Sequence, residues 1–102
     1  MYEKGLRVEQ NYAEAAEWYR KAAEQGDETA QNDLGFMYHE GRGVAQDYVQ
    51  ALGWYRKAAD QGNPNARFGL GLMYLEGQGV AQDYAKAFGL FSKAADQGYA
   101  PA

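Results

Sequence analysis

The sequence predicts an all-α solenoid, in which antiparallel pairs of helices stack along one axis. The first observation is an internal repeat with an offset of 36 residues. The second is composition: the apolar residues are mainly Ala and Tyr, which favours close helix packing over strands. The third is that glycines in register separate two apolar stripes of helical spacing in each unit. A fixed period of this size is typical of solenoid repeats. The positions in register include Tyr2, Tyr38 and Tyr74; Tyr12, Tyr48 and Tyr84; and Gly26, Gly62 and Gly98.

The first two helices are expected at 11–25 and 28–40. The first ends before Gly26 and the second before Gly41, and glycine at such a position favours the left-handed conformation that closes helices. Residues 1–4 match only the last turn of a preceding helix. Arg7 stands where the later units have a second loop glycine, so the first loop is expected to bend differently.

The third helix is expected at 47–61. Asp47 suits the N-cap, because its carboxylate can accept hydrogen bonds from free backbone N–H groups, and Gln50 would complete a capping box. Gly62 then closes the helix. The side chains of one face follow at spacings of four, seven and eight: Ala51, Tyr55, Ala58 and Ala59.

The last two helices are expected at 64–76 and 83–97. Pro64 suits the first helical position, where its missing N–H would have no partner in any case. Glycines at 77 and 79 break the fourth helix, and Asp83 caps the fifth. Because the connections are short, consecutive helices should pack as antiparallel pairs. The buried face of the fourth helix is expected to include Ala66, Leu70, Met73 and Tyr74.

Glycines inside the helices recur at fixed repeat positions. Each costs roughly 0.5–1 kcal/mol relative to alanine. Gly35 and Gly71 share one position, which suggests that a neighbouring ring or backbone lies too close for a Cβ. The same interpretation applies to Gly53 and Gly89, although Glu17 occupies that position in the first copy.

Charge and composition exclude several classes of protein. The net charge is -4 and the basic residues are scattered, which disfavours nucleic acid as a partner. Without cysteine there is no disulfide frame and no thiolate metal site. No apolar run is long enough for a membrane span, and no signal peptide is visible. The compartment stays unknown.

The loop and helix motifs resemble the Sel-one-like repeat (SLR), a relative of the tetratricopeptide repeat. The resemblance covers essentially the whole chain and implies a right-handed superhelix, in which the first helix of each unit, the A helix, lines a concave face. It also implies an adaptor or scaffold role, often in bacteria. One domain, 1–102, would hold about 2.8 repeats: a partial unit at 1–26, units at 27–62 and 63–98, and the start of another at 99–102. The motif of the second unit is Ala30, Leu34-Gly35, Tyr38, Gly41-Arg42-Gly43-Val44, Asp47, Ala51, Trp54-Tyr55, Ala58-Ala59 and Gly62.

The residues offer little for catalysis. His39 is the only histidine and Ser92 the only serine, and they belong to different units, so no base stands beside a nucleophile. His39 is expected on the outward side of its helix, and the adjacent Glu40 on a different face. We therefore expect no enzyme activity, no cofactor and no metal site. The recurring tyrosines are interpreted as structural staples whose rings pack between helices.

One stripe departs from the repeat and predicts a partner site. Phe68, Leu72 and Leu75 share the face of their helix that lies away from its expected buried side. Structural positions should repeat, and these do not. A second apolar face on a surface helix often marks a binding surface, although packing against the neighbouring A helix would also explain it. The predicted partner-binding positions are Asn32, Phe36, His39, Phe68, Leu72 and Leu75.

Two functions remain open from the sequence. The first is a non-catalytic scaffold that binds a peptide or protein on its concave face. The second is a structural or engineered module that associates with itself through uncapped ends, because Phe88, Leu90 and Phe91 lie on a last helix that no further unit covers.

Overall fold

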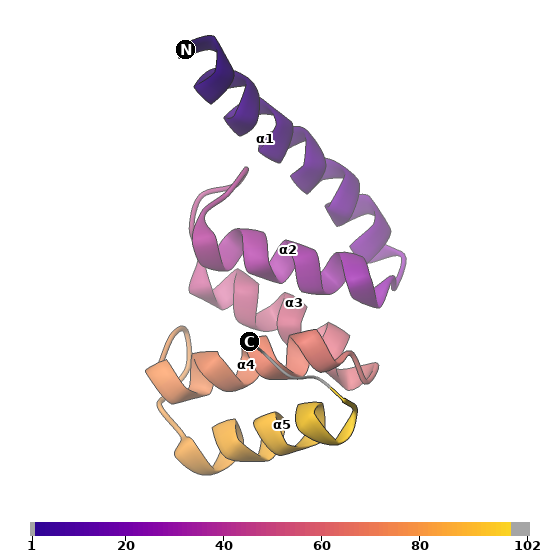
Figure 1. The fold of residues 1–102 in the computed structure, drawn as a ribbon, viewed down its shortest axis with the longest axis vertical. Helices are drawn as coiled ribbons and strands as arrows, with labels where there is room; N and C mark the ends of the chain where they lie inside the picture. The colour runs from indigo at the N-terminus through magenta and orange to yellow at the C-terminus, as the bar shows by residue number, and fades with distance from the viewer. Residues whose placement is uncertain (1, 99–102) are drawn as a thin grey trace.

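Five helices stacked along one axis form the fold (Figure 1). The structure is a computed structural model that describes the backbone of residues 2–98 and the side chains of residues 11–98. The stack measures 44 × 26 × 26 Å, and each helix packs against the next one along the chain. The predicted all-α solenoid is confirmed. The helices are α1 (Tyr2–Glu24), α2 (Glu28–Glu40), α3 (Tyr48–Asp60), α4 (Pro64–Glu76) and α5 (Tyr84–Asp96).

Short polar side chains begin four of the helices. Asp27, Asp47, Asn63 and Asp83 each accept a hydrogen bond from the backbone N–H three residues later, over 2.9–3.1 Å. These bonds satisfy N–H groups that have no partner inside the helix. Pro64 occupies the first turn of α4, as predicted. The repeated caps explain why the bounds of α2 and α4 match the sequence prediction, while α3 and α5 begin and end one residue inside it.

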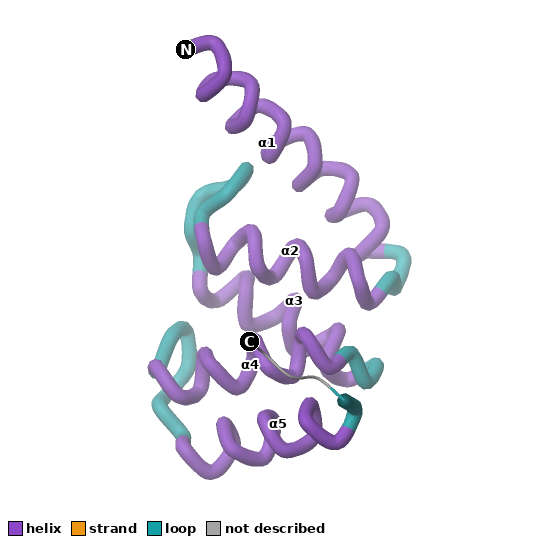
Figure 2. The backbone as a smooth tube through the Cα atoms, in the orientation of Figure 1, coloured by secondary structure: helices purple, strands orange, loops and turns teal. Residues whose placement is uncertain are grey.

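Glycines in the left-handed region close the helices. Gly41, Gly62, Gly77 and Gly98 have φ angles of 72°, 92°, 67° and 90°, which confirms the predicted turns. The long loops after α2 and α4 lie on one side of the stack and the short turns on the other (Figure 2).

The start of α1 differs from the prediction, because the helix begins at Tyr2 and not at residue 11. In the later loops Gly43 and Gly79 have φ angles of 74° and 71° and lie against the backbone carbonyls of Tyr12 and Tyr48. Arg7 occupies the matching position, and a residue with a Cβ disfavours that left-handed conformation. The chain therefore continues as a helix where the later units form a loop. The predicted start of a further unit at 99–102 lies outside the described residues.

The core is a continuous band along the stack. Its buried side chains include those expected on the buried face of the fourth helix, Ala66, Leu70, Met73 and Tyr74, and the apolar face of the third, Ala51, Tyr55, Ala58 and Ala59. Leu34 and Tyr38 of α2 are buried as well. A Cβ at Gly35 would lie 2.9 Å from the Tyr55 ring, and one at Gly71 would lie 2.7 Å from the Phe91 ring. The predicted close approach at these two glycines is confirmed.

The same interpretation was wrong for Gly53 and Gly89. A Cβ at either position would meet no atom of another part of the described chain within 4 Å. Both glycines face open space on the outer side of a helix, so packing does not explain them.

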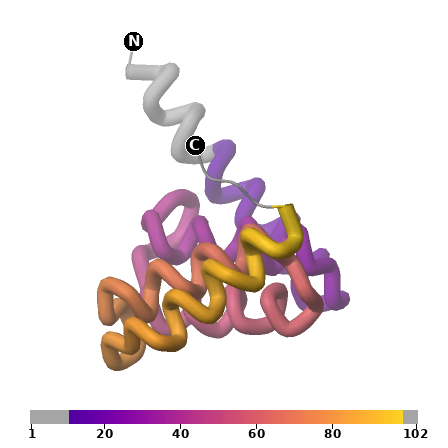
Figure 3. Tube along the Cα trace, turned by 60° about the horizontal axis from the view of Figure 1, so that its bottom comes forward, coloured from indigo at the N-terminus to yellow at the C-terminus, as the bar shows by residue number. Residues whose placement is uncertain are grey.

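The A helices form the inner row of the stack. In the described part of the chain α2 contacts α4, whereas α1, α3 and α5 do not contact one another. Figure 3 shows α4 and α5 side by side as the last antiparallel pair. No helix in the described part of the chain, including α1 with its 23 residues, is both long and apolar enough to cross a bilayer.

Candidate partner-binding site

His39 joins two repeats. It was expected from the sequence on the outward side of its helix, but its side chain does not point freely to solvent. Its half-buried ring lies 2.7 Å from Glu40 Oε2 through Nδ1 and 2.8 Å from Gln78 Oε1 through Nε2. The ring also packs at a tilt against Tyr48, with centroids 5.3 Å apart and an interplanar angle of 45°. Glu40 was expected on another face, but its flexible side chain reaches back to the imidazole. Among the side chains that the structure describes, no three His, Asp or Glu groups could hold a metal ion together.

The six predicted partner-binding residues occupy two different environments. Phe68 packs on Phe91 with ring centroids 5.2 Å apart, Leu75 packs against the core, and Asn32 and His39 are half-buried. Phe36 and Leu72 are 49% and 37% exposed. They lie two residues beyond the buried Leu34 and Leu70, about 200° around their helices. They therefore face away from the core side of α2 and α4.

A pocket of about 290 Å³ opens beside Phe36, between α1 and α2. Its walls are mainly apolar and aromatic, with one carboxylate and one guanidinium. Of the residues that line it, only Phe36 was predicted from the sequence to bind a partner. The lining residues are Tyr12, Ala15, Tyr19, Asp33, Phe36, Met37 and Arg42.

In the next unit α2 covers the surface that matches this pocket, because Gly35 lies against the Tyr55 ring and His39 contacts Tyr48 and Gln78. In the next unit Tyr55 packs against Gly69, where a Cβ would lie 2.8 Å from the ring. Asp33 occupies the matching position in α2, and a side chain there leaves no room for a ring. The matching Tyr19 is 36% exposed, whereas Tyr55, which also packs against Gly35 of α2, is 6% exposed. The exchange of glycine for aspartate at this lining position was readable in the repeat.

Asp33 and Arg42 are the two charged groups of the pocket. Burial raises the pKa of Asp33; a hydrogen bond with Asn32 opposes the shift, and the negative charge of Asp27 adds to it. Arg42 Nη1 donates to Tyr12 Oη over 2.9 Å, and its guanidinium carbon lies 5.4 Å from the Tyr12 ring centroid. One hydrogen bond leaves the other guanidinium N–H groups available to a ligand.

Comparison with protein families identifies the repeat. The family model described as Sel1 repeat matches residues 1–27, 29–63 and 64–99. The chain belongs to the Sel1 repeat family. Sel1 repeat proteins are generally protein-interaction scaffolds. No curated protein matches the chain.

Solved Sel1 repeat structures share the fold. A protective antigen of uropathogenic Escherichia coli with an SLR fold is 44% identical, with a TM-score of 0.85 over 96% of this chain and 22% of that one. A Sel1 repeat protein from Oxalobacter formigenes is 40% identical, with a TM-score of 0.85 over 86% of this chain and 25% of that one. Cysteine-rich protein B of Helicobacter pylori is 27% identical, with a TM-score of 0.77 over 82% of this chain and 63% of that one. The chain thus spans about a quarter of the first two proteins.

The tyrosines of these Sel1 units act partly as predicted. Tyr38 and Tyr74 are buried, and their hydroxyls accept hydrogen bonds from Arg20 and Arg56 over 2.6 Å and 3.1 Å. Tyr55 is the buried ring between α2 and α4. Tyr19 and Tyr84 are exposed, so the staple interpretation was wrong for them.

Asp33 should give this Sel1 protein a measurable pH dependence. Because its folded pKa lies above the unfolded value of 3.8, the folded state holds the proton more tightly. The resulting stabilisation is present below that pH and is lost as pH rises through the folded pKa. We expect Asp33→Asn to be more stable than the wild type at neutral pH, with the advantage shrinking towards pH 3. Urea denaturation across this range measures it, and an advantage equal to that of the exposed control Glu14→Gln would contradict the role of burial.

Proposed function

We propose that the chain is a non-catalytic scaffold that binds a peptide segment of a partner protein on the inner side of its stack. The pocket beside Phe36 carries the proposal. It is a mainly apolar hollow in a chain whose family consists generally of interaction scaffolds. Its lining includes Asp33, where the next repeat has Gly69. The partner would place one bulky apolar side chain in the hollow.

The chemistry of the walls supports an apolar side chain as the ligand. Tyr12, Tyr19 and Phe36 offer ring faces, and Met37 adapts its shape to what it contacts. A volume of about 290 Å³ is at the low end of the range for small-molecule sites, which is roughly 300–1,000 Å³. It suits one or two side chains better than a large cofactor. Arg42 can bind a carbonyl or carboxylate of the same peptide.

Phe36→Ser should weaken the binding of peptides selected on the wild-type protein. Peptides from a random dodecamer library, selected on the immobilised chain, serve as the probe. A buried aromatic anchor in an interface is worth about 2 kcal/mol or more, so Kd should rise at least roughly tenfold. Val49→Ser, at an exposed apolar position on the outer side of α3, is the control. Equal losses in the two variants, or no loss in Phe36→Ser, would refute the proposal.

A second candidate is self-association through the last helix. Phe88 is 60% exposed, whereas Leu52 at the same position of the preceding unit is 8% exposed. In that unit the next A helix covers the position. The surface of α5 at the end of the stack therefore has the shape that receives a further repeat. We propose that a second copy of the chain can supply it by head-to-tail stacking.

Phe88→Glu should reduce the mass measured by light scattering at high protein concentration while helicity stays intact. Phe88 tests this better than Phe91, which packs against Phe68 and Gly71 in the core. A monomeric mass for the wild type at every concentration would rule out the second candidate and leave the first untouched.

A further inference from the structure

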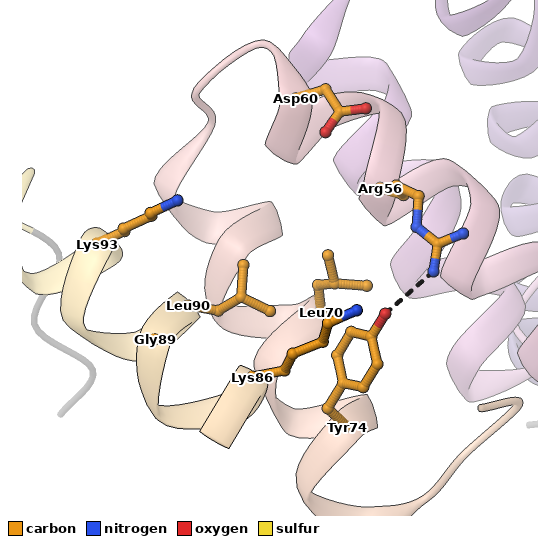
Figure 4. Close-up of a pocket in the computed structure, with 8 residues that line it drawn as sticks. All are labelled: Arg56, Asp60, Leu70, Tyr74, Lys86, Gly89, Leu90 and Lys93. Atoms are coloured by element: carbon orange, nitrogen blue, oxygen red, sulfur yellow. Dashed lines mark hydrogen bonds between the residues drawn. The ribbon is translucent and has the colours of Figure 1, made fainter. Parts of the chain in front are cut away.

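We propose that a second site, on the outer side of the stack, binds an acidic peptide segment with an apolar side chain between carboxylates. The site is the groove between α3 and α5, called here the outer groove, with a volume of about 360 Å³ (Figure 4). It differs in position, charge and proposed ligand from the pocket beside Phe36, called here the inner pocket.

The arrangement of the helices creates the outer groove. α3 and α5 do not contact each other in the described residues, and α4 lies between them. Leu70 and Tyr74 of α4 form the floor, and Leu90 of α5 completes the apolar part. Leu70 and the exposed Leu72 are about 200° apart around α4. The groove therefore lies on the side of α4 opposite to the inner row.

The lining is positively charged in a chain that is negative overall. Arg56, Lys86 and Lys93 face one carboxylate, Asp60, which gives a local balance of +2 (three minus one), against -4 for the whole chain. Among the side chains of residues 11–98 the one ion pair joins His39 and Glu40, so none of the three cations forms a direct ion pair with a described carboxylate.

Two of the cations surround a ring. Arg56 Nη2 donates to Tyr74 Oη over 3.1 Å, which leaves further guanidinium N–H groups free. Lys86 Nζ lies 5.3 Å from the centroid of the Tyr74 ring. Lys93 lies at the other end of the groove, with Leu70 and Leu90 between (Figure 4). Cations at both ends of an apolar floor complement a ligand with carboxylates on both sides of an apolar side chain.

Gly89 keeps the groove accessible. A glycine inside a helix costs about 0.5–1 kcal/mol relative to alanine, and here no packed neighbour within 4 Å requires it. The first copy has Glu17 at this position, so the fold tolerates a large side chain. A bare backbone on the wall of a groove allows the close approach of another chain.

The preceding repeat provides an internal comparison. Gly53 also lines a groove, but a smaller one of about 210 Å³. There Gln50 takes the position of Lys86, and Trp54 that of Leu90. Lys57, the counterpart of Lys93, lies over the Trp54 ring at 4.6 Å. We therefore assign acidic-peptide binding to the later groove alone.

The probe is a fluorescein-labelled, C-terminally amidated peptide with the core Glu-Glu-Leu-Glu-Glu. Matched probes have Gln-Gln-Leu-Gln-Gln and Glu-Glu-Gly-Glu-Glu, which remove the charges or the apolar side chain. Fluorescence anisotropy with the full chain should show binding of the first probe, several-fold weaker binding of the other two, and a Kd that rises with salt.

Variants taken from the repeat itself locate the binding. An exposed charge pair contributes about 0.2–1 kcal/mol, so Lys86→Gln should raise Kd up to about fivefold. Gly89→Glu places a carboxylate and its bulk in the groove and should abolish binding while the circular dichroism spectrum stays helical. Lys57→Gln in the smaller groove and Phe36→Ser at the inner pocket should leave Kd unchanged.

The opposite results would overturn the proposal. One such result is that the Glu-Glu-Leu-Glu-Glu probe does not bind at millimolar protein. Another is that the Gln-Gln-Leu-Gln-Gln probe binds with the same affinity, or that the Gly89→Glu variant binds the first probe as tightly as the wild type. Competition by inorganic phosphate as effective as that by unlabelled peptide would show a simple anion site. A loss of affinity in Phe36→Ser would place the peptide in the inner pocket, which supports the function proposed above and refutes the outer groove.

Discussion

Replacing Leu34 by alanine is expected to lower the free energy of unfolding by about 2–5 kcal/mol. Leu34 has no exposed surface and belongs to the band of buried residues that joins the repeats. Small domains are stable by only about 5–15 kcal/mol, and a solenoid unit buries its apolar face only against its neighbours. Removing this side chain leaves a cavity that the stack cannot fill.

Urea denaturation followed by circular dichroism measures the effect on Leu34. Leu72→Ala, on the exposed inner surface of α4, is the matched control and should change stability by less than about 1 kcal/mol. If the two variants lose the same stability, the core and exposed faces of the A helices have been wrongly separated.

Three glycine-to-alanine variants are expected to fall in a fixed order of stability. Gly79→Ala should lose the most, because its φ is +71° and a Cβ would lie 2.9 Å from the Tyr48 carbonyl oxygen. Gly62→Ala meets no neighbour within 4 Å but has φ +92°, so it should lose about 1–2 kcal/mol from conformation alone. Gly89→Ala is helical and open, and should gain about 0.5–1 kcal/mol.

The same denaturation measurement ranks the three glycine variants. The order tests the distinction between glycines that the backbone requires and glycines that it does not. A Gly79→Ala protein as stable as Gly62→Ala would show that the loop does not rest on the start of α3. A destabilised Gly89→Ala would show a packing contact at the outer groove and would remove one support for the binding proposal.

The sequence predicted most of the fold because each signal is local and occurs two or three times. Asp47 and Asp83 cap helices through hydrogen bonds within one turn, and Gly41 and Gly77 close helices through their own φ angles. The start of α1 was missed because the sequence alone does not show that the loop needs a positive φ angle at the position of Arg7. Gly43 and Gly79 adopt that angle in the later units. A glycine that recurs at one repeat position was expected to indicate a close neighbour. This was right for Gly71 and wrong for Gly89, because recurrence alone does not reveal whether a neighbour is present.

The candidate sites were less predictable, because both lie between helices. Phe36 was found as a departure from the repeat. The pocket beside it also needs Tyr19, which is exposed, whereas Tyr55 at the matching position of the next unit is buried between α2 and α4. The outer groove joins side chains of three helices, including Arg56 and Lys86, which are 30 positions apart in the sequence. Only the packed structure shows that α3 and α5 do not meet and leave a groove over α4.

The most direct test of the scaffold function is an amide NMR titration of the ¹⁵N-labelled chain with a library-selected dodecapeptide. Binding at the inner side predicts that the largest shift changes lie in α2 and in the facing part of α1, centred on Phe36, Asp33 and Tyr19. Shift changes confined to the outer sides of α3 and α5, around Val49 and Gly89, would contradict the proposed inner site.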